Sequence, residues 1–419
     1  MANEKEPNRM LSGYRALDLT DERGFLCGKI LGDLGVDVIK IEKPGGDPSR
    51  NIAPFFHDTP DPEKSLYWFA FNASKRGITL NIETDDGREI FKKLTTTADF
   101  IIESSPPGYM DKIGLGYEDI SQVHPEAVFT SITPFGQTGP YRDFKTSDIV
   151  SMAESGGLYV TGDPDRPPVR VGFPQAYSFA GVEAAAGTLM ALHYRHMTSK
   201  GQHVDISIQR SLTTVSYDVP GWWTSSHVMI RRQGATWKRP KAGAARVIHP
   251  CKDGFVSFVH FGGIRHAKKN EALVQWMDEE GMATDFLKQM DWVSLSWTEM
   301  TPDDLKNLEE PTRKFFMTHT KKELLEGSLK REILLYPVST PKDLLENEQL
   351  ESRGYWTALF HPELDTSIVY PGPWVKASET DNRTQRRAPL IGEHNQEVYV
   401  GELGFSQSDL VILKQIDVI

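Results

Sequence analysis

Short apolar runs alternate with longer segments of helical periodicity in the N-terminal third of the chain. Residues 15–19 are a short apolar run that predicts a buried strand. Residues 25–34 carry apolar side chains at helical spacing, and Gly35 follows them as a helix-ending glycine. Residues 36–41 predict the next strand. A strand–helix–strand segment of this kind builds parallel sheets.

A second unit of the same kind follows. Residues 78–80 predict a strand, residues 84–94 a helix with acidic residues at its start, and residues 100–102 another strand. Residues 127–132 form a further apolar run. The repeated pattern predicts an α/β fold with an open parallel, Rossmann-like sheet, and such sheets bind ligands at the carboxyl ends of their strands.

The pattern changes in the middle of the chain. A stretch rich in tryptophan and basic residues comprises Trp222, Trp223, Arg231, Arg232, Trp237, Lys238, Arg239 and Lys241. Residues 249–259 predict a turn and a strand, and acidic helical segments follow. We therefore expect a large domain whose N-terminal part is 1–224, a smaller inserted domain at 225–335, and a return to the large domain at 336–419.

Composition and charge narrow the function classes. The chain has 419 residues and a net charge of −11, which argues against nucleic acid as a partner. No apolar run is long enough for a membrane span, and residues 1–9 are polar, so we expect neither membrane association nor a signal peptide. The two cysteines, Cys27 and Cys251, favour a reducing, cytoplasmic location, and the scattered histidines predict no metal site.

Several sequence blocks, in order, resemble the class III CoA-transferases. The blocks are residues 31–42, 72–81, 132–141, 171–181 and 201–205. The resemblance implies an interlocked dimer, in which each chain forms an open ring and both chain ends contribute to the large domain. It also implies coenzyme A as a substrate that is transferred between an acyl-CoA, such as succinyl-CoA, and a carboxylic acid.

Tyr177 occupies the position of the family's catalytic aspartate. In the family this Asp precedes a Gly by four residues, and here Gly181 is that Gly. The same Asp lies about 25 residues before the Gln of the last block, which here is Gln202. The family's Asp attacks the acyl-CoA thioester, whereas a phenol with a pKa near 10 is mostly protonated at neutral pH. We therefore predict no catalytic residue in this chain.

The resemblance also implies the residues that contact CoA. Arg50 and Lys75 match family positions near the nucleotide, and Arg76 is adjacent to them in the second of these blocks. Gly136 and Gly139 fit a tight loop beside the site. The family's CoA-holding turn, Glu-Asn-aromatic-basic-Pro-Gly, is altered at residues 103–108, where Ser104 replaces the Asn. We predict that these six residues form the CoA site.

Three functions stay open from the sequence. The missing Asp favours a non-catalytic subunit of a heteromeric CoA-transferase, whose Asp-containing homologous partner would bind acyl-CoA and acid at its own site. The second is an active homodimeric transferase or acyl-CoA racemase that uses another residue, for which Glu154 and Glu183 are candidates. The third is a non-enzymatic CoA-binding or assembly protein.

Overall fold

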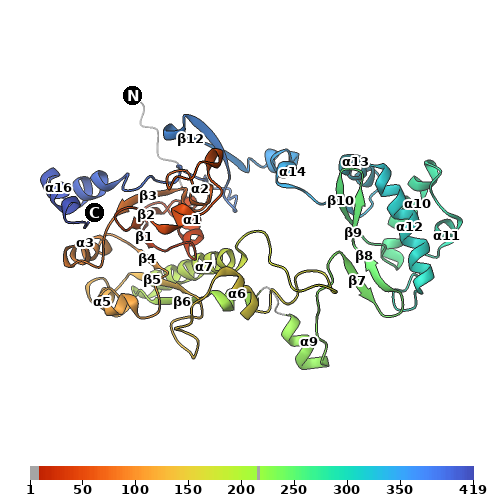
Figure 1. Ribbon diagram of the computed structural model, residues 1–419, viewed down its shortest axis with the longest axis horizontal. Coiled ribbons are helices and arrows are strands. Elements are labelled where there is room, and N and C mark those ends of the chain that lie inside the picture. Colours follow the sequence, from red (N-terminus) through yellow and green to blue (C-terminus); the bar gives the residue numbers. More distant parts are fainter. Residues whose placement is uncertain (1–8, 215–217) are drawn as a thin grey trace. The chain divides into compact units, whose positions relative to one another are not determined.

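A parallel sheet of six strands forms the centre of the larger part of the molecule (Figure 1). The computed structural model orders the strands β3-β2-β1-β4-β5-β6, and all neighbouring pairs are parallel. The strands are β1 (Arg15–Leu19), β2 (Asp37–Glu42), β3 (Lys75–Thr79), β4 (Phe100–Glu103), β5 (Val128–Thr133) and β6 (His203–Ser207). The predicted α/β class with an open parallel sheet is confirmed.

Helices cover both faces of this sheet. Successive side chains of a strand point to opposite faces, so the apolar strand residues build one core on each side. Ala16 of β1 packs with α1 (Phe25–Asp33) and α7 (Gln175–Thr198). Leu17, the next residue, packs in the core of the other face. That face is covered by α3 (Asp85–Thr95), α4 (Tyr109–Lys112), α5 (Tyr117–Val123), the π-helix η5 (Gln396–Glu402) and α16 (Gln407–Gln415). The result is a three-layer arrangement (Figure 1).

Close packing between α1 and α7 fixes the start of α7. A Cβ atom on Gly181 would lie 2.8 Å from the Cβ atom of Leu26, so only glycine fits there. The helix also buries Ala176, Ala180 and Ala184 along the same face. This close contact sets the position of the first turn of α7, which carries Tyr177.

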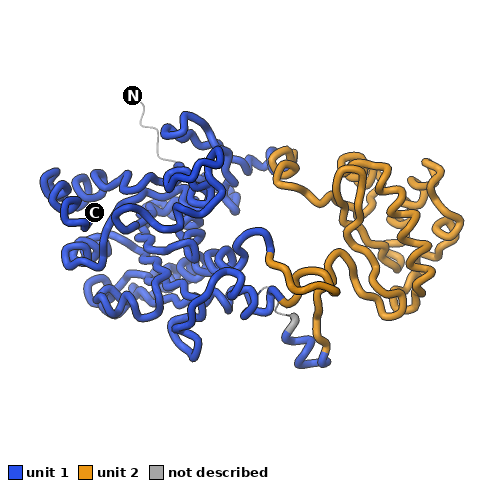
Figure 2. The backbone as a smooth tube through the Cα atoms, viewed as in Figure 1, with its two compact units in different colours: residues 1–158, 171–227, 349–419 blue, residues 159–170, 228–348 orange. Residues whose placement is uncertain are grey.

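The structure describes residues 9–214 and 218–419, so the polar segment at residues 1–8 lies outside it. Two compact units divide the chain: 1–158 with 171–227 and 349–419, and 159–170 with 228–348 (Figure 2). The predicted small domain, 225–335, falls almost wholly in the second unit. Among the described residues, no helix combines the length and apolar character that crossing a membrane requires.

The remaining elements connect or flank these layers. In the larger unit they are η1 (Pro48–Asn51), η2 (Phe56–Asp58), α2 (Leu66–Asn72), α6 (Asp148–Glu154), α8 (Ile208–Thr213), α9 (Asp218–Ser226), β12 (Trp356–His361), η4 (Pro362–Leu364) and β13 (Thr366–Pro371). In the smaller unit they are β7 (Thr236–Arg239), β8 (Gly243–Arg246), β9 (Ile248–Cys251), β10 (Gly254–Phe258), α10 (Ile264–Glu279), α11 (Asp285–Gln289), α12 (Pro302–Thr318), α13 (Lys321–Lys330), β11 (Leu335–Pro337) and α14 (Pro341–Leu345), and α15 (Glu348–Ser352) spans the boundary. The smaller unit has a core of its own, built from the sheet β11-β10-β9 and its helices.

A fully buried ion pair lies beneath the loop that follows β1. Lys75 donates from Nζ to Asp18 Oδ2 at 2.7 Å, and neither side chain is exposed. Asp18 also accepts hydrogen bonds from the backbone N–H and the hydroxyl of Thr20. Lys40, equally buried, donates to the carbonyl oxygen of Thr20 at 2.5 Å. The cluster therefore holds the first residue of the loop.

Replacing Lys75 with methionine should destabilise the protein by about 3 to 5 kcal/mol, because the variant removes the cation that hydrogen-bonds to the buried Asp18 carboxylate. Only Lys40 remains, with its Nζ 3.9 Å from Asp18 Oδ1. Lys43→Met is the matched control, since the Lys43–Glu83 pair is solvent-exposed, with side chains 62% and 50% accessible. The control should change stability by no more than about 1 kcal/mol. Urea unfolding measures both values, and equal losses in the two variants would contradict the assigned role.

Candidate functional site

The loops after β1 and β4 meet at the carboxyl edge of the sheet. These two strands are neighbours although β2 and β3 lie on the far side of β1, and such a reversal of strand order creates a ligand crevice in α/β sheets. Ser104, the first residue after β4, joins the loops. Its hydroxyl accepts a hydrogen bond from the Asp21 N–H at 2.8 Å and donates to Asp21 Oδ1 at 2.9 Å. Ser104, a predicted CoA contact, therefore lies at the edge of the sheet where the strand order reverses.

Tyr177 lies in the first turn of α7. Asp148 Oδ1 accepts hydrogen bonds from the Ala176 N–H at 2.9 Å and from the Tyr177 N–H at 3.4 Å. Backbone N–H groups in the first turn of a helix have no partner within the helix and carry partial positive charge. The Asp148 carboxylate satisfies two of them and holds the backbone of Tyr177 in place.

The surroundings of Tyr177 keep its phenol protonated. Burial raises the pKa of Tyr177 to about 12, and the carboxylates of Glu22, Asp148 and Asp21 add to the rise, while Arg23 opposes it. At neutral pH the hydroxyl is therefore neutral. A neutral phenol is a poor nucleophile toward a thioester.

A second phenol, Tyr67 of α2, shares these neighbours. Burial raises the pKa of Tyr67, with further contributions from Glu22 and from Tyr177. Glu22 accepts a hydrogen bond from the Ser49 hydroxyl at 2.9 Å. Sequence reasoning missed Asp21 and Glu22, although they belong to a charged triplet that starts two residues after the predicted strand 15–19. That triplet was the available signal.

Arg50, a predicted CoA contact, is engaged within the chain. It is 1% exposed, and its Nε and Nη2 atoms donate to the two carboxylate oxygens of Glu42 at 2.6 and 2.8 Å. Its Nη1 atom donates to Glu63 at 2.7 Å, and the guanidinium packs 3.9 Å from the ring centroid of Trp68. The side chain thus has four intramolecular partners, counting the carbonyl of Pro389.

Lys75 and Arg76 also have intramolecular partners. Lys75 is paired with Asp18 as described above. Arg76 forms a two-point contact with Asp37, at 2.9 and 2.6 Å, and ion pairs with two glutamates of η5. Asp37 begins β2, so Arg76 is bound at the amino edge of the sheet, opposite the edge that carries Ser104. CoA contact by the three cations stays a prediction.

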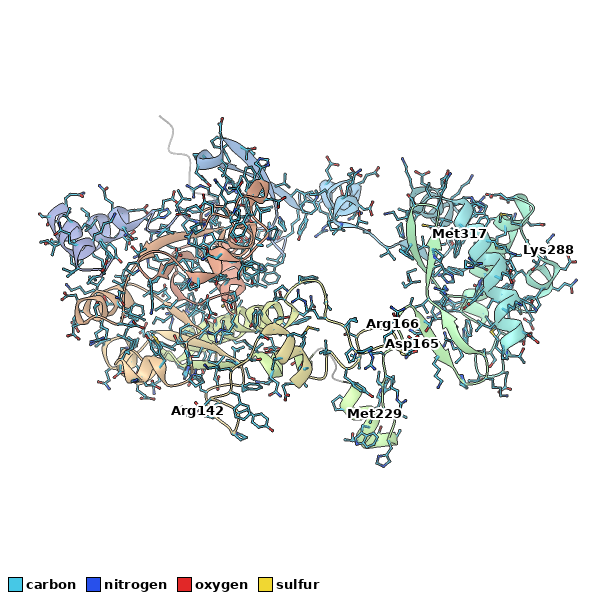
Figure 3. The ribbon with its side chains drawn as sticks, in the orientation of Figure 1. Arg142, Asp165, Arg166, Met229, Lys288 and Met317 are labelled. Atoms are coloured by element: carbon cyan, nitrogen blue, oxygen red, sulfur yellow. The ribbon has the colours of Figure 1, made fainter. Side chains whose placement is uncertain are left out.

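The loop between β5 and α6 brings further groups to the carboxyl edge. Gly136 and Gly139 have φ values of 90° and 96°, a conformation that favours glycine. The N–H that follows Gly136 bonds both carboxylate oxygens of Asp205. Arg142 lies on the same loop (Figure 3), with Nη2 3.4 Å from where a Cβ on Gly108 would be. A cation that the sequence interpretation did not name therefore lies beside the altered turn.

The two proposed substitute nucleophiles lie elsewhere in the larger unit. Glu183 accepts a hydrogen bond from the Ser211 hydroxyl at 2.7 Å and lines a cavity of about 510 Å³ beside β6. Glu154 is exposed at the end of α6. The carboxylates with the largest effects on the pKa of Tyr177 are the three named above, and neither Glu154 nor Glu183 is among them.

A buried glutamate ends β4 at the same edge. Glu103 is 2% exposed and accepts a hydrogen bond from the Ser105 N–H at 2.6 Å. Burial raises the pKa of Glu103 from its ordinary value of 4.5 to about 7, although hydrogen bonds from Ser131 and Ser105 oppose the rise. The carboxyl group of the first residue of the altered turn is therefore partly protonated at neutral pH.

The chain matches the model of the CoA-transferase family III over residues 11–395, and it belongs to that family. It is 35% identical to the succinyl-CoA:(R)-benzylsuccinate CoA-transferase subunit BbsE of Thauera aromatica, over 94% of each chain. It is 30% identical to the formyl-CoA:oxalate CoA-transferase of Streptomyces avermitilis, over 98% of this chain and 100% of that one. The predicted family is confirmed.

A solved structure supports the fold. A CAIB/BAIF family protein from Brucella suis superposes with a TM-score of 0.80 at 26% identity, over 94% of this chain and 99% of that one. The α/β architecture with a parallel sheet is therefore that of the family. A dimer is consistent with this membership, and CoA is the substrate that the family name implies.

The raised pKa of Glu103 predicts a pH-dependent stability. The folded carboxyl keeps its proton up to about pH 7, whereas the unfolded one releases it near 4.5. The unfolding free energy should therefore fall as pH rises across this window, by about 3 kcal/mol from this group. Glu103→Gln should lose this part of the pH dependence. Urea unfolding at pH 5 to 8 measures the difference, and parallel curves for the two proteins would disprove it.

Proposed function

We propose that the chain is a non-catalytic subunit of a heteromeric class III CoA-transferase. Its partner is an Asp-containing homologue that binds acyl-CoA and a carboxylic acid at its own site. The observation that supports this most strongly is Tyr177, whose phenol stands at the family's Asp position with a pKa raised to about 12. A covalent mechanism through a carboxylate requires an ionised group at that point.

The proposed reaction moves CoA from an acyl-CoA such as succinyl-CoA to a carboxylic acid. The relative named as a subunit of succinyl-CoA:(R)-benzylsuccinate CoA-transferase supports both the subunit role and (R)-benzylsuccinate as the acceptor. That acceptor would place the chain in anaerobic toluene degradation, a form of aromatic degradation. The buried free thiols of Cys27 and Cys251 suit the proposed cytoplasmic location.

A second candidate function rests on Glu22. A carboxylate close enough to affect both Tyr67 and Tyr177 is a possible displaced nucleophile, which would make the chain an active transferase or racemase by itself. Its hydrogen bond from Ser49 and its position on a short loop argue for an orienting role instead. The trapping experiment below separates the two functions.

The purified chain alone should show no CoA-transferase turnover, and activity should appear when an Asp-bearing homologue is co-expressed with it. Incubation with succinyl-CoA and hydroxylamine should label the partner's aspartate, as read by peptide mass spectrometry. The reason is that only an ionised carboxylate forms the acyl intermediate. A label on Glu22, Glu154 or Glu183, or turnover by the single chain, would favour the second function.

Replacing Tyr177 with aspartate should not create an active chain. The negative charges of Asp21, Glu22 and Asp148 would raise the pKa of the new carboxyl and oppose its ionisation. We expect turnover at least about 100-fold below that of the complex. Tyr177→Phe, which keeps the ring and removes the hydroxyl, should leave the activity of the complex unchanged. Near-normal rates from the Tyr177→Asp homodimer would refute the proposal.

A further inference from the structure

Arg239, at the end of β7 in the smaller unit, holds its guanidinium between two tryptophan rings. The guanidinium carbon lies 5.0 Å from the ring centroid of Trp237 and 4.2 Å from that of Trp297. Its Nε and Nη2 atoms are buried, and neither has a hydrogen-bond partner within the described part of the chain. Burial lowers the pKa of Arg239, yet arginine stays charged in proteins. Two charged donors are thus withdrawn from water without hydrogen-bond partners, while the side chain as a whole is only partly buried.

The unpaired edge of Arg239 is the edge that binds carboxylates elsewhere in this protein. Arg50 uses Nε and Nη2 to hold both oxygens of Glu42, at 2.6 and 2.8 Å. Arg76 uses the same two atoms to hold both oxygens of Asp37, at 2.9 and 2.6 Å. Two parallel hydrogen bonds of this kind match the planar geometry of a carboxylate. Arg239 presents this edge with no protein carboxylate against it in the described residues.

The neighbourhood of Arg239 favours an anion with an apolar body. The ring of Phe261 lies 6.3 Å from that of Trp237, and His266 lies 5.2 Å from Phe261. His266 Nδ1 is buried and also has no partner among the described residues. His266 lies in the first turn of α10, and that turn contains no acidic residue. Gly263, the residue before the helix, has no side chain that could cap its first N–H groups. Nothing negative therefore competes for the site at that helix start.

We propose that Arg239 binds the carboxylate of a small organic acid, with the acid's apolar part against Trp237 and Phe261. The Nε–H and Nη2–H groups donate to the two carboxylate oxygens. Trp237, which is 41% exposed and contacts the guanidinium, turns aside in this proposal to admit the ligand. Its movement exposes two donors that were buried without partners, so the ligand compensates a cost already present in the free protein. Every group in this site belongs to the smaller unit, and binding does not depend on the proposed CoA-transferase role.

Isothermal titration of the full chain with phenylacetate tests the proposal, with phenylacetamide and sulfate as comparison ligands. Phenylacetate should bind, whereas the neutral amide, which has the same shape without the charge, should not. Sulfate, which lacks the aromatic body, should bind at least about tenfold more weakly than phenylacetate. Absence of phenylacetate binding, or equal binding of the amide, would overturn the proposal. Equal binding of sulfate would reduce the site to a general anion site and overturn the assigned ligand class.

Two variants distinguish binding by the Arg239 side chain from a general effect of the positive charges on its strand. Arg239→Gln should weaken phenylacetate binding about tenfold or more, because it removes the two charged donors. Lys238→Gln, which removes the adjacent exposed charge from the same strand, should change binding less than about twofold. Unchanged phenylacetate binding by Arg239→Gln would refute the site.

A thermal melt of Arg239→Gln distinguishes a ligand-binding role from a structural one. Removal of two buried donors that lack hydrogen-bond partners should leave the melting temperature equal or higher. Phenylacetate should raise the melting temperature of the unmodified chain and of Lys238→Gln but not that of Arg239→Gln. If Arg239→Gln melts much lower and phenylacetate stabilises it as well as the unmodified chain, Arg239 is a structural support and the proposal fails.

Discussion

Asp18 and Lys75 are both inaccessible to solvent, and their ion pair joins the end of β1 to the beginning of β3. The same carboxylate holds the N–H and hydroxyl of Thr20, and Lys40 holds the carbonyl oxygen of that residue. Thr20 begins the loop that carries Asp21, Glu22 and Arg23. Because charges buried at this depth are stable only when paired and hydrogen-bonded, the loop has little freedom to move. The chemistry around Tyr177 depends on this constraint.

Much of the larger unit could be predicted from hydrophobic periodicity. The strand at residues 15–19 was predicted with its observed bounds, and the helix that follows it was predicted within one residue of its end. The strand predicted at residues 78–80 instead occupies Lys75–Thr79. Periodicity missed its start because Lys75 and Arg76 are charged, and they are buried only through partners distant in sequence. Pattern alone does not reveal which charges are neutralised in the fold.

The sequence located the candidate site at Tyr177, but it did not identify the side chains that surround this residue. The spacing to Gly181 located Tyr177, since the glycine is required where α7 meets α1. The carboxylates opposite Tyr177 were not found, because their proximity to α7 arises from the sheet order, which places β1 beside β4. Arg50 was chosen by family position alone. Its engagement with Glu42 and Glu63 depends on the loop after β2, whose path the sequence does not specify.

Tyrosine at position 177 is compatible with the charges around it in a way that aspartate would not be. Asp148 already occupies the positive end of α7, so the helix dipole is no longer available to stabilise a second anion there. Asp21 and Glu22 add negative charge from the opposite loop. A carboxylate at position 177 would therefore face like charges, whereas a phenol is neutral and meets no such repulsion. The neutral Tyr177 and the acidic loop therefore suit each other. Replacing only Tyr177 with aspartate would add a negative charge that Asp21 and Glu22 repel.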